Sequence, residues 1–183
     1  MAEITYEGHA IVSADGMIAD ATGAMPPALR NDADWQSFQA ALDRSALVVL
    51  GRLGHSRHPN PGRRRLVHSR SVKDLAVDPV DQRAVFWNPA DIDIGTVLER
   101  LGIAAGTIAI TGGTGTFDLF LPHYHRFVLA EVKDLKLPNG IPCFSAGPPR
   151  EMLAAHGLAL RSEVAIDVGV SQSVWERVQR AGG

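Results

Sequence analysis

The chain has 183 residues, of which 45% are apolar and 21% charged, so it is long enough to bury a core as one domain over residues 1–183. A net charge of −2 disfavours nucleic acid as the main partner, and the single cysteine, Cys143, excludes an internal disulfide and a multi-cysteine zinc site. No secretory leader or membrane-spanning apolar run is recognisable. We therefore expect a soluble, cytoplasmic protein without a metal site.

The first predicted element is a buried strand over residues 8–13, and a long loop follows it. Residues 14–30 show no periodicity and contain Asp15-Gly16, Gly23 and Pro26-Pro27. A loop of this length in a compact domain is usually functional or mobile. Its glycines and prolines suit a lid that closes over a ligand, although a plain surface excursion is the alternative interpretation.

A helix is predicted over residues 31–44, because Asn31 is a good N-cap and Asp34 follows three residues later. At about 100° per residue, Asp34 lies roughly 60° from the centre of the apolar stripe and Asp32 roughly 100° from it. Asp34 therefore borders the buried face, although both aspartates can be explained by the helix dipole alone. The stripe consists of Trp35, Phe38, Ala41 and Leu42.

Two further predicted strands each end beside an arginine. Residues 46–50 lead into Gly51-Arg52, and the short segment after them must stop by Pro59. Residues 65–69 form an extended strand that ends in Ser69-Arg70. Ligands bind at the carboxyl ends of strands in open α/β sheets. Arg52 and Arg70 are thus candidates for anion binding, with solvation of the sheet rim as the alternative.

Residues 107–121 have the pattern of a buried strand, a tight turn and a helix. Residues 107–110 are β-branched or apolar, Gly112-Gly113 makes the turn, and apolar residues then recur at helical spacing. Glycines let backbone N–H groups approach a ligand, and a helix N-terminus suits a phosphate or pyrophosphate. A purely structural turn needs glycine as well, so the turn alone does not establish dinucleotide binding.

The remaining elements determine the predicted fold class. Residues 84–87 indicate a strand and residues 92–101 a helix, while residues 124–133 and 158–175 are strand-like. Prolines and glycines between positions 138 and 149 break the connection between these last two segments. Strand and helix alternate first and strands dominate the end, which predicts an α/β fold with a largely parallel sheet and antiparallel C-terminal strands.

Several short motifs, in the same order, resemble the dihydrofolate reductase family, including its relative, the reductase domain of riboflavin biosynthesis. They run from about Gly8 to Val132 and read IVSADGMIA, AMPP…LRN, DWQSFQ, VVLGR, PGR, LVHSR, ITGGTGTFDLFLP and VLAEV. The resemblance implies a dihydrofolate reductase-like fold with about eight strands and helices on both faces. It also implies an NADPH-dependent reductase with a small-molecule substrate, and it leaves the oligomeric state open.

The resemblance further implies which residues hold NADPH. Gly112-Gly113 and residues 114–117 would cradle the pyrophosphate and approach the nicotinamide. Arg52 and Ser69-Arg70 fall where the family holds the adenosine end and its extra phosphate, and two cationic side chains suit a dianion. The full expected set is Ile11, Ile18, Ala19, Gly51, Arg52, Leu53, Gly54, Ser69, Arg70, Gly112, Gly113, Thr114, Gly115, Thr116 and Phe117.

On the substrate side, the resemblance implies one acidic residue at the start of the first helix. Asp34 fits best by its spacing to Phe38 and Gly51, and Asp32 is the alternate. Burial in a closed apolar pocket should raise the pKa of the carboxyl and help it to deliver a proton as hydride arrives. Arg63 in PGR matches the arginine that holds the folate tail carboxylate. The expected substrate contacts are Ala10, Trp35, Phe38, Arg63 and Thr111.

Four positions depart from the family pattern and bear on the substrate. Pro27 stands where the family commonly has a lid tryptophan, and Gly54 stands where a hydroxyl usually contacts the cofactor. Ala130 replaces a threonine that supports the acid, and Thr111 replaces an apolar residue beside the pterin. The expected reaction is reduction of 7,8-dihydrofolate to tetrahydrofolate by NADPH.

Two alternatives remain beside this reaction. The first is a reductase of the same fold that acts on a phosphorylated ribosylamino-pyrimidine, because SADGMIAD and residues 63–65 suit a sugar phosphate. The second is a non-catalytic module that binds a nucleotide or pterin.

Overall fold

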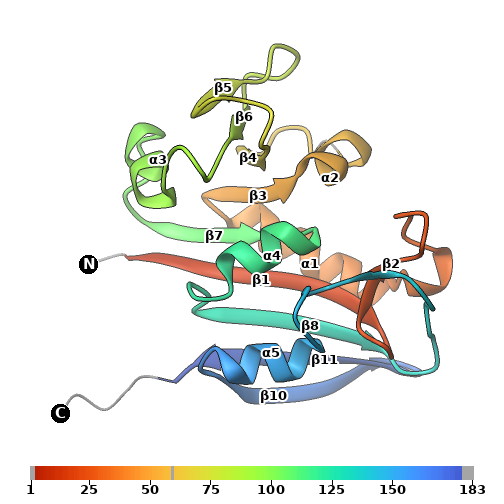
Figure 1. Cartoon of the computed structure of the whole chain (residues 1–183). Coiled ribbons are helices and arrows are strands. Elements are labelled where there is room, and N and C mark those ends of the chain that lie inside the picture. The colour runs from red at the N-terminus through yellow and green to blue at the C-terminus, as the bar shows by residue number, and fades with distance from the viewer. Residues whose placement is uncertain (1–2, 59, 179–183) are drawn as a thin grey trace.

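The computed structural model describes residues 3–58 and 60–178, and in these residues the central feature is a nine-stranded sheet. Its strand order is β10-β11-β8-β1-β7-β3-β4-β6-β5 (Figure 1). The strands are β1 (Ile4–Ser13), β3 (Leu47–Gly51), β4 (Arg65–His68), β5 (Leu75–Val77), β6 (Ala84–Trp87), β7 (Gly106–Ile110), β8 (Arg126–Val132), β10 (Leu158–Asp167) and β11 (Val170–Arg177). The short strands β2 (Met17–Ala19) and β9 (Ile141–Pro142) pair with each other in a separate sheet.

Most neighbouring strands of the large sheet run parallel. The pairs β1–β7, β1–β8, β3–β7, β3–β4 and β4–β6 are parallel. The strands β10 and β11 add to β8 in antiparallel fashion, and β5 lies antiparallel to β6 at the other edge. The predicted parallel sheet with an antiparallel C-terminal addition is therefore confirmed, with β5 as an antiparallel edge strand that the sequence pattern had not indicated.

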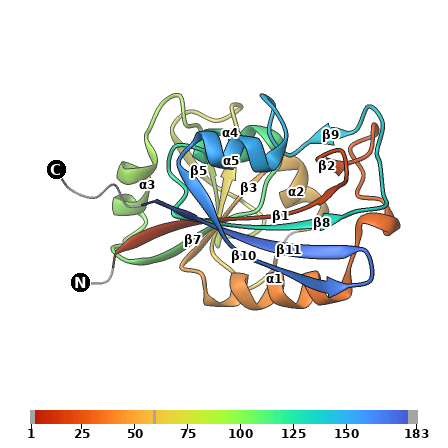
Figure 2. The same ribbon diagram turned by 90° about the horizontal axis from the view of Figure 1, so that it is seen from below.

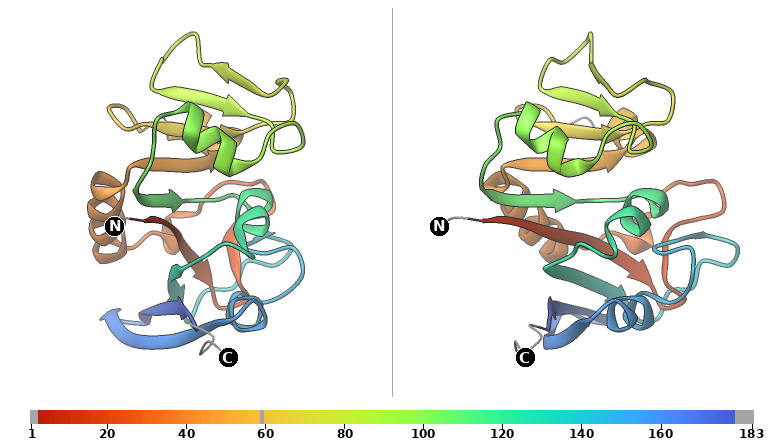
Figure 3. Two further views of the ribbon diagram at one scale, coloured as in Figure 1. Left: turned by 90° about the vertical axis from the view of Figure 1, so that its left-hand side faces the viewer. Right: turned by 60° about the vertical axis from the view of Figure 1, so that its left-hand side comes forward.

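Helices cover both faces of the sheet, as expected. The helix α1 (Asp32–Arg44) lies on one face, and α4 (Thr114–Phe120) and α5 (Pro149–Ala155) lie on the other (Figures 2 and 3). The remaining helical segments are the 3-10 turn η1 (Pro27–Leu29), α2 (Arg52–Arg57) and α3 (Ile94–Arg100). The apolar runs of the central strands follow from this arrangement, because both of their faces are buried.

Strand β3 shows how alternate side chains supply the two cores. Leu47 and Val49 belong to the larger cluster, under α3 and α4, whereas Val48 and Leu50 pack with Leu42 of α1. This is the period of two that a β-strand imposes. The four residues are nearly inaccessible to solvent.

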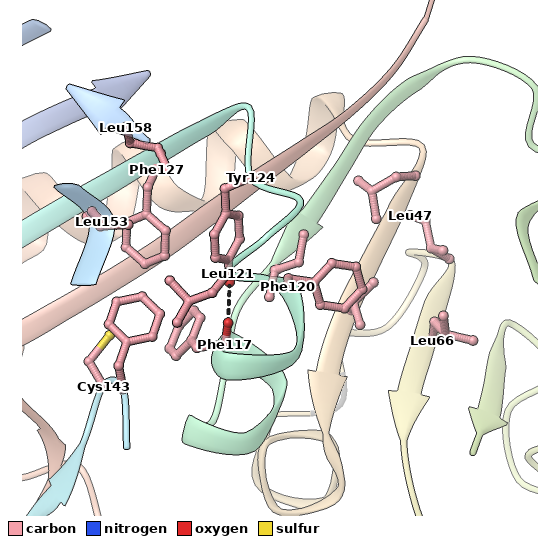
Figure 4. Packing of buried hydrophobic residues seen from close by; sticks show 14 of the residues in the cluster. Leu47, Leu66, Phe117, Phe120, Leu121, Tyr124, Phe127, Cys143, Leu153 and Leu158 are labelled. Carbon is pink, nitrogen blue, oxygen red and sulfur yellow. Dashed lines mark hydrogen bonds between the residues drawn. The ribbon is translucent and has the colours of Figure 1, made fainter. Parts of the chain in front are cut away.

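The larger core is rich in aromatic residues from the C-terminal half of the chain. Figure 4 shows Phe117 and Phe120 of α4 beside Tyr124 and Phe127. The buried hydroxyl of Tyr124 donates a 3.2 Å hydrogen bond to the backbone oxygen of Phe117, which satisfies its polar atom. The rings of Tyr124 and Phe127 meet edge to face with centroids 5.0 Å apart, a favoured geometry for aromatic pairs.

Several element boundaries differ from those expected from the sequence. Strand β1 begins at Ile4 and not at Gly8, because parallel pairing with β7 starts at Ile4. The loop over residues 14–30 contains β2 and η1. Helix α5 occupies a stretch where prolines predicted only a break, since a proline in the first helical turn needs no N–H partner. Pro59, the expected end of the segment after β3, lies outside the described residues.

The start of α1 is held by the predicted N-cap. The side-chain oxygen of Asn31 accepts a 3.0 Å hydrogen bond from the backbone N–H of Asp34, and its amide donates to Asp167 at 2.8 Å. The first bond satisfies a donor that the helix itself cannot pair. The cap therefore also determines where Asp34 enters the helix.

Replacing Asn31 by Ala should lower the free energy of unfolding by about 1–2 kcal/mol, because a helix donor loses its acceptor. Urea denaturation followed by circular dichroism measures this change. Asn31→Ser is the matched control, because serine keeps the cap but loses the bond to Asp167. Equal losses in the two variants would show that the cap contributes nothing.

Candidate active site at the carboxyl edge of the sheet

The parallel strands β1, β3, β4 and β7 end at the same edge of the sheet, and most predicted site residues lie there. Val49 pairs with Ile110, and Gly51 pairs with His68, so the segments that follow these strands are neighbours. Strand β2 lies beside the carboxyl end of β1 in Figure 1. The fold thus gathers segments that are distant in the sequence at one edge, which is where α/β sheets bind ligands.

The glycine turn after β7 packs directly against the end of β3. The backbone N–H of Gly51 donates to the carbonyl oxygen of Gly112 at 2.8 Å. A Cβ atom on Gly51 would lie 3.6 Å from the nitrogen of Gly113. Gly112 has a φ of +104°, and a Cβ atom there would lie 2.8 Å from a ring carbon of Phe117. Both the backbone angle and the space therefore require glycine at position 112.

The turn leaves backbone available to a ligand. The Gly112–Gly113 peptide is cis, Gly112 is buried and Gly113 is exposed. Within the described part of the chain, the N–H of Gly113 has no hydrogen-bond partner. An exposed backbone donor of this kind can bind an anionic oxygen.

Helix α4 continues the site from the turn, and His68 at the end of β4 supports it. The Nδ1 atom of His68 and the buried hydroxyl of Thr116 are 3.1 Å apart. A Cβ atom on Gly115 would lie 4.0 Å from the His68 ring. Burial lowers the pKa of His68, and the nearby charge of Arg70 lowers it further. His68 was missed from the sequence, although its position directly before Ser69-Arg70 was a signal.

Arg52 and Ser69 meet through a serine that the sequence did not single out. The guanidinium of Arg52 donates to the hydroxyl of Ser71 at 2.6 Å, and the hydroxyls of Ser69 and Ser71 are 2.9 Å apart. The Arg52 guanidinium also lies 6.0 Å from the ring centre of Phe86. Arg70 is exposed next to this group. The edge therefore carries two exposed cations with hydroxyls between them.

The loop after β1 crosses this edge and contacts two other segments. Asp15 accepts hydrogen bonds from the backbone N–H of Leu137, at 3.0 and 3.1 Å. Further along, the guanidinium of Arg57 in α2 donates to the carbonyl oxygen of Gly23. The loop is thus connected at its base to the segment before β9 and at its tip to α2.

The expected lid residues of this loop lie beside the glycine turn. The Cδ1 atom of Ile18 lies 4.0 Å from the Cβ position of Gly113. Ala19 is buried and pairs with Ile141 of β9. Thr114 donates to the carbonyl of Pro142 at 2.5 Å, which joins α4 to the same small sheet.

Asp34, and not Asp32, points into the fold. Its carboxyl is half-buried and accepts a 3.4 Å hydrogen bond from the side-chain amide of Gln172 on β11, whereas Asp32 is exposed. Burial raises the pKa of Asp34, and the Gln172 hydrogen bond and the charge of His9 oppose that rise. The half-turn between the two aspartates therefore separates a solvated group from one held against the sheet.

A second set of ionisable groups that the sequence did not single out lies on β1, close to Asp34. Nε2 of His9 lies 2.9 Å from a carboxylate oxygen of Glu7, and Arg126 of β8 donates to the other oxygen at 2.9 Å. Burial alone would raise the pKa of Glu7, but these partners lower it to about 2. The His9 ring is 5.7 Å from that of Phe38. The sequence feature that could have indicated this group is the pair Glu7 and His9, two ionisable residues at alternate positions of an apolar strand.

The face of the sheet that carries α1 also holds an open cleft of about 600 Å³. Arg63 lies in it, but its guanidinium is engaged by Asp43 at 2.6 Å, by Gln39 at 2.9 Å and by Asn60 at 2.8 Å. The exposed ring of Trp35 forms part of the wall. The lining residues are Trp35, Gln39, Asp43, Arg57, His58, Asn60, Pro61, Gly62 and Arg63.

Other expected residues have mainly structural contacts. Phe117 is buried among Phe127 and Phe144, so its ring belongs to the core. Ala10 packs against the same core, and Ile11 lies opposite Ala130 of β8. Three expected site residues remain. The N–H of Thr111 donates to the carbonyl oxygen of Val49 at 3.0 Å, Leu53 is exposed, and Gly54 lies beside Leu50.

Comparison with known proteins identifies the fold. No family model matches the sequence, and no curated protein does. Among solved structures, a diaminohydroxyphosphoribosylaminopyrimidine deaminase/5-amino-6-(5-phosphoribosylamino)uracil reductase from Thermotoga maritima is similar, with a TM-score of 0.70 and 14% identity. The match covers 96% of this chain, and the chain spans 57% of that protein.

Two further solved structures match over nearly their whole length. A Shewanella sp. PV-4 protein assigned to riboflavin biosynthesis has a TM-score of 0.65 and 21% identity, over 98% of this chain and all of the other. Dihydrofolate reductase from Enterococcus faecalis, in complex with NADP(H), has a TM-score of 0.64 and 15% identity, over 96% and 97%.

This chain has the dihydrofolate reductase-like fold. The structural similarity agrees with the resemblance of the short motifs and with the mostly parallel sheet. At 14–21% identity it shows the fold and leaves the reaction to be argued from the site. None of the described helices has the length and apolarity needed to cross a membrane.

Replacing Gly112 by Ala should lower the free energy of unfolding by about 1–3 kcal/mol or more, because the positive φ is strained and the methyl group meets Phe117. Guanidinium denaturation measures the change. Gly102→Ala is the control, because Gly102 has a φ of +68° but no atom within 4 Å of its Cβ position. If the two variants lose the same stability, the contact with Phe117 is not a constraint.

Proposed function

We propose that this chain is a single-domain, NADPH-dependent reductase that transfers hydride to a small heterocyclic substrate. The observation that carries the proposal is the half-buried Asp34 carboxyl, held at the start of α1 with a raised pKa. A carboxyl that stays protonated closer to neutral pH can act as a general acid. The dihydrofolate reductase-like fold and the glycine turn at the strand ends support the same reaction class.

The residues at the sheet edge suit NADPH. The N–H of Gly113, which has no partner among the described residues, would donate to the pyrophosphate, and glycine at 112 lets the ligand approach the backbone closely. Arg52 and Arg70, with Ser69 between them, would bind the additional phosphate of NADPH by charge-assisted hydrogen bonds. Ile18 and Ala19 would cover the nicotinamide side of the turn. When bound, NADPH supplies the hydride.

Asp34 would complete the reduction by giving a proton to the ring nitrogen of the substrate. Its ionised form would then be stabilised by the amide of Gln172. Phe38 and Trp35 lie on the same helix, with ring centres 5.9 Å apart, and would form the apolar wall of the substrate pocket. With this wall beside it, the Asp34 carboxyl would meet the substrate in one orientation.

Dihydrofolate is the first candidate substrate. The 2-amino-4-oxo edge of a pterin ring would donate to Asp34, which is the acid implied by the motif resemblance. Arg63 would bind the carboxylate of the folate tail in place of Asp43, its present partner at 2.6 Å. That exchange has a cost, because the ion pair with Asp43 and the bonds to Gln39 and Asn60 must rearrange.

The engagement of Arg63 favours a second candidate, a phosphorylated ribosylamino-pyrimidine that lacks the folate tail. Its uracil ring lacks the 2-amino group of a pterin and would present a ring N–H to Asp34 instead. The cleft beside α1 also carries Arg57 and His58, and these two side chains would suit a sugar phosphate without displacing the partners of Arg63. The Thermotoga maritima protein, whose reductase acts on a phosphoribosylamino-uracil, matches with a TM-score of 0.70.

Replacing Asp34 by Asn should reduce substrate turnover by roughly 100-fold near neutral pH while NADPH affinity stays within a few fold, because the change removes the acid on the substrate side and leaves the NADPH residues intact. The rate of NADPH oxidation is measured with dihydrofolate and with 5-amino-6-(5-phosphoribosylamino)uracil. Nicotinamide fluorescence gives the affinity. Asp32→Asn is the matched control on the same helix and should retain activity.

Three other outcomes of this experiment are informative. Loss of turnover in Asp32→Asn alone would assign the acid to Asp32. Oxidation with only one substrate would choose between the two candidates. Tight NADPH binding with neither substrate turned over would contradict the reductase and favour the non-catalytic binding module.

Replacing Arg52 by Leu should weaken NADPH binding by roughly 10- to 100-fold, the equivalent of losing one hydrogen bond to a charged group, and should change NADH binding little. Fluorescence titration with both dinucleotides measures the two affinities. Arg44→Leu, at the exposed end of α1, is the control. Equal weakening of NADPH and NADH binding would remove Arg52 from the phosphate site.

A further inference from the structure

The C-terminal strand β11 reaches the acid on α1. Gln172 lies opposite Ala130 of β8, and Ala130 lies opposite Ile11 of β1, so the three side chains follow one row across the sheet. Gln172 is at the end of this row, and its side-chain amide donates a 3.4 Å hydrogen bond to the Asp34 carboxyl. Ala130 has no side-chain donor. The side-chain donor to Asp34 in this row is thus Gln172, one strand beyond Ala130.

A second group approaches Asp34 from β1. His9 is 8% exposed and follows Glu7 by two residues on the same face, toward α1. Its Nε2 atom is 2.9 Å from Glu7, which is also paired with Arg126 at 2.9 Å. The His9 ring packs at 5.7 Å against that of Phe38, which lies one helical turn after Asp34. The ring is therefore held on two sides.

We propose that Gln172, which bonds the Asp34 carboxyl, and the Glu7–His9 pair, which packs against Phe38 on the same helix, are positioning residues for Asp34. The C-terminal strand β11 and the polar side of β1 are then parts of the active site. This inference rests on the proposed role of Asp34 as the proton donor. It adds three residues, Gln172, Glu7 and His9, that the short motifs do not include.

The physical consequence is a balance between burial and hydrogen bonding at Asp34. Burial favours the neutral carboxyl, whereas the Gln172 amide and the charge of His9 favour the carboxylate. The ionisable groups on this side include His9 and Glu7 on β1, Arg126 on β8, Asp167 at the end of β10 and the exposed Asp32 on α1 itself. A carboxyl in such a balance can give a proton and take it up again in each cycle.

Titration of the Asp34 carboxyl by carbon-13 NMR tests the proposal without reference to any substrate. The signal is assigned from Asp34→Asn. In Gln172→Met, which keeps the side-chain length but loses the donor, the pKa of Asp34 should rise. It should also rise in His9→Gln, which keeps a polar side chain beside Glu7 but removes the positive charge. Gln36→Met, on the exposed face of the same helix, is the control and should leave the pKa unchanged.

The pH dependence of turnover provides the second readout. If Asp34 gives its proton during the reaction, activity falls as pH rises through its pKa. That fall should move to higher pH in Gln172→Met and His9→Gln, and a merely structural role would lower the rate equally at every pH. Urea denaturation of each variant confirms that it is folded.

The two readouts separate this inference from the proposed function. An unchanged pKa of Asp34 in both folded variants overturns the inference, even if the protein is an active reductase. A raised pKa in a protein without reductase activity supports the positioning of Asp34 and contradicts the proposed reaction. If one variant does not fold, the other decides the result.

Discussion

The site depends on the close contact between the ends of β3 and β7. The N–H of Gly51 binds the carbonyl of Gly112 at 2.8 Å, and Gly112 has a positive φ and no room for a Cβ atom beside the Phe117 ring. The contact directs the chain after β3 into α2 and the chain after β7 into α4. Arg52, which begins α2, and Thr116, in α4, are positioned as a result. A change at Gly112 would therefore act on the whole edge.

Helix α1 adds the acidic group to this framework through its own local rules. Asn31 caps the helix at Asp34, and the apolar side chains of Phe38 and Leu42 hold it against the sheet. Once the starting residue and the buried face are set, the helical period turns Asp34 toward β11 and leaves Asp32 in water. The electrostatic difference between the two aspartates follows from about half a turn of helix.

Arg52 and Arg63 were both predicted to bind anionic ligands, but in the structure Arg63 is already paired with protein groups and Arg52 remains exposed. Both follow motif positions that the resemblance assigns to anionic ligands. Arg52 contacts a serine hydroxyl and an aromatic ring and remains exposed, whereas Arg63 is bound by a carboxylate and two amide side chains. A ligand at Arg63 must replace these partners, so substrates without a tail carboxylate lose less there. This difference makes the phosphorylated pyrimidine a serious competitor to dihydrofolate.

The sequence by itself determined the features that depend on local chemistry. The capped helix over residues 31–44, the buried strand over residues 84–87 and the glycine turn after residue 110 were all predictable, because caps, apolar periods and glycine angles act within a few residues. The choice of Asp34 as the inward-facing aspartate also followed from the helical period. The order of the predicted strands and helices was sufficient to predict the sheet and its antiparallel end.

Only the tertiary structure decided which distant side chains meet. Gln172 is 138 positions after Asp34, and it reaches the carboxyl because β11 pairs with β8 in one register. Likewise, Arg126 lies 119 positions after Glu7, and the pair exists because β8 lies beside β1. A side-chain pattern within one strand indicates which face is buried, but it contains no information about the register between strands. The partners of Asp34 and Arg63 therefore had to be learned from the folded chain.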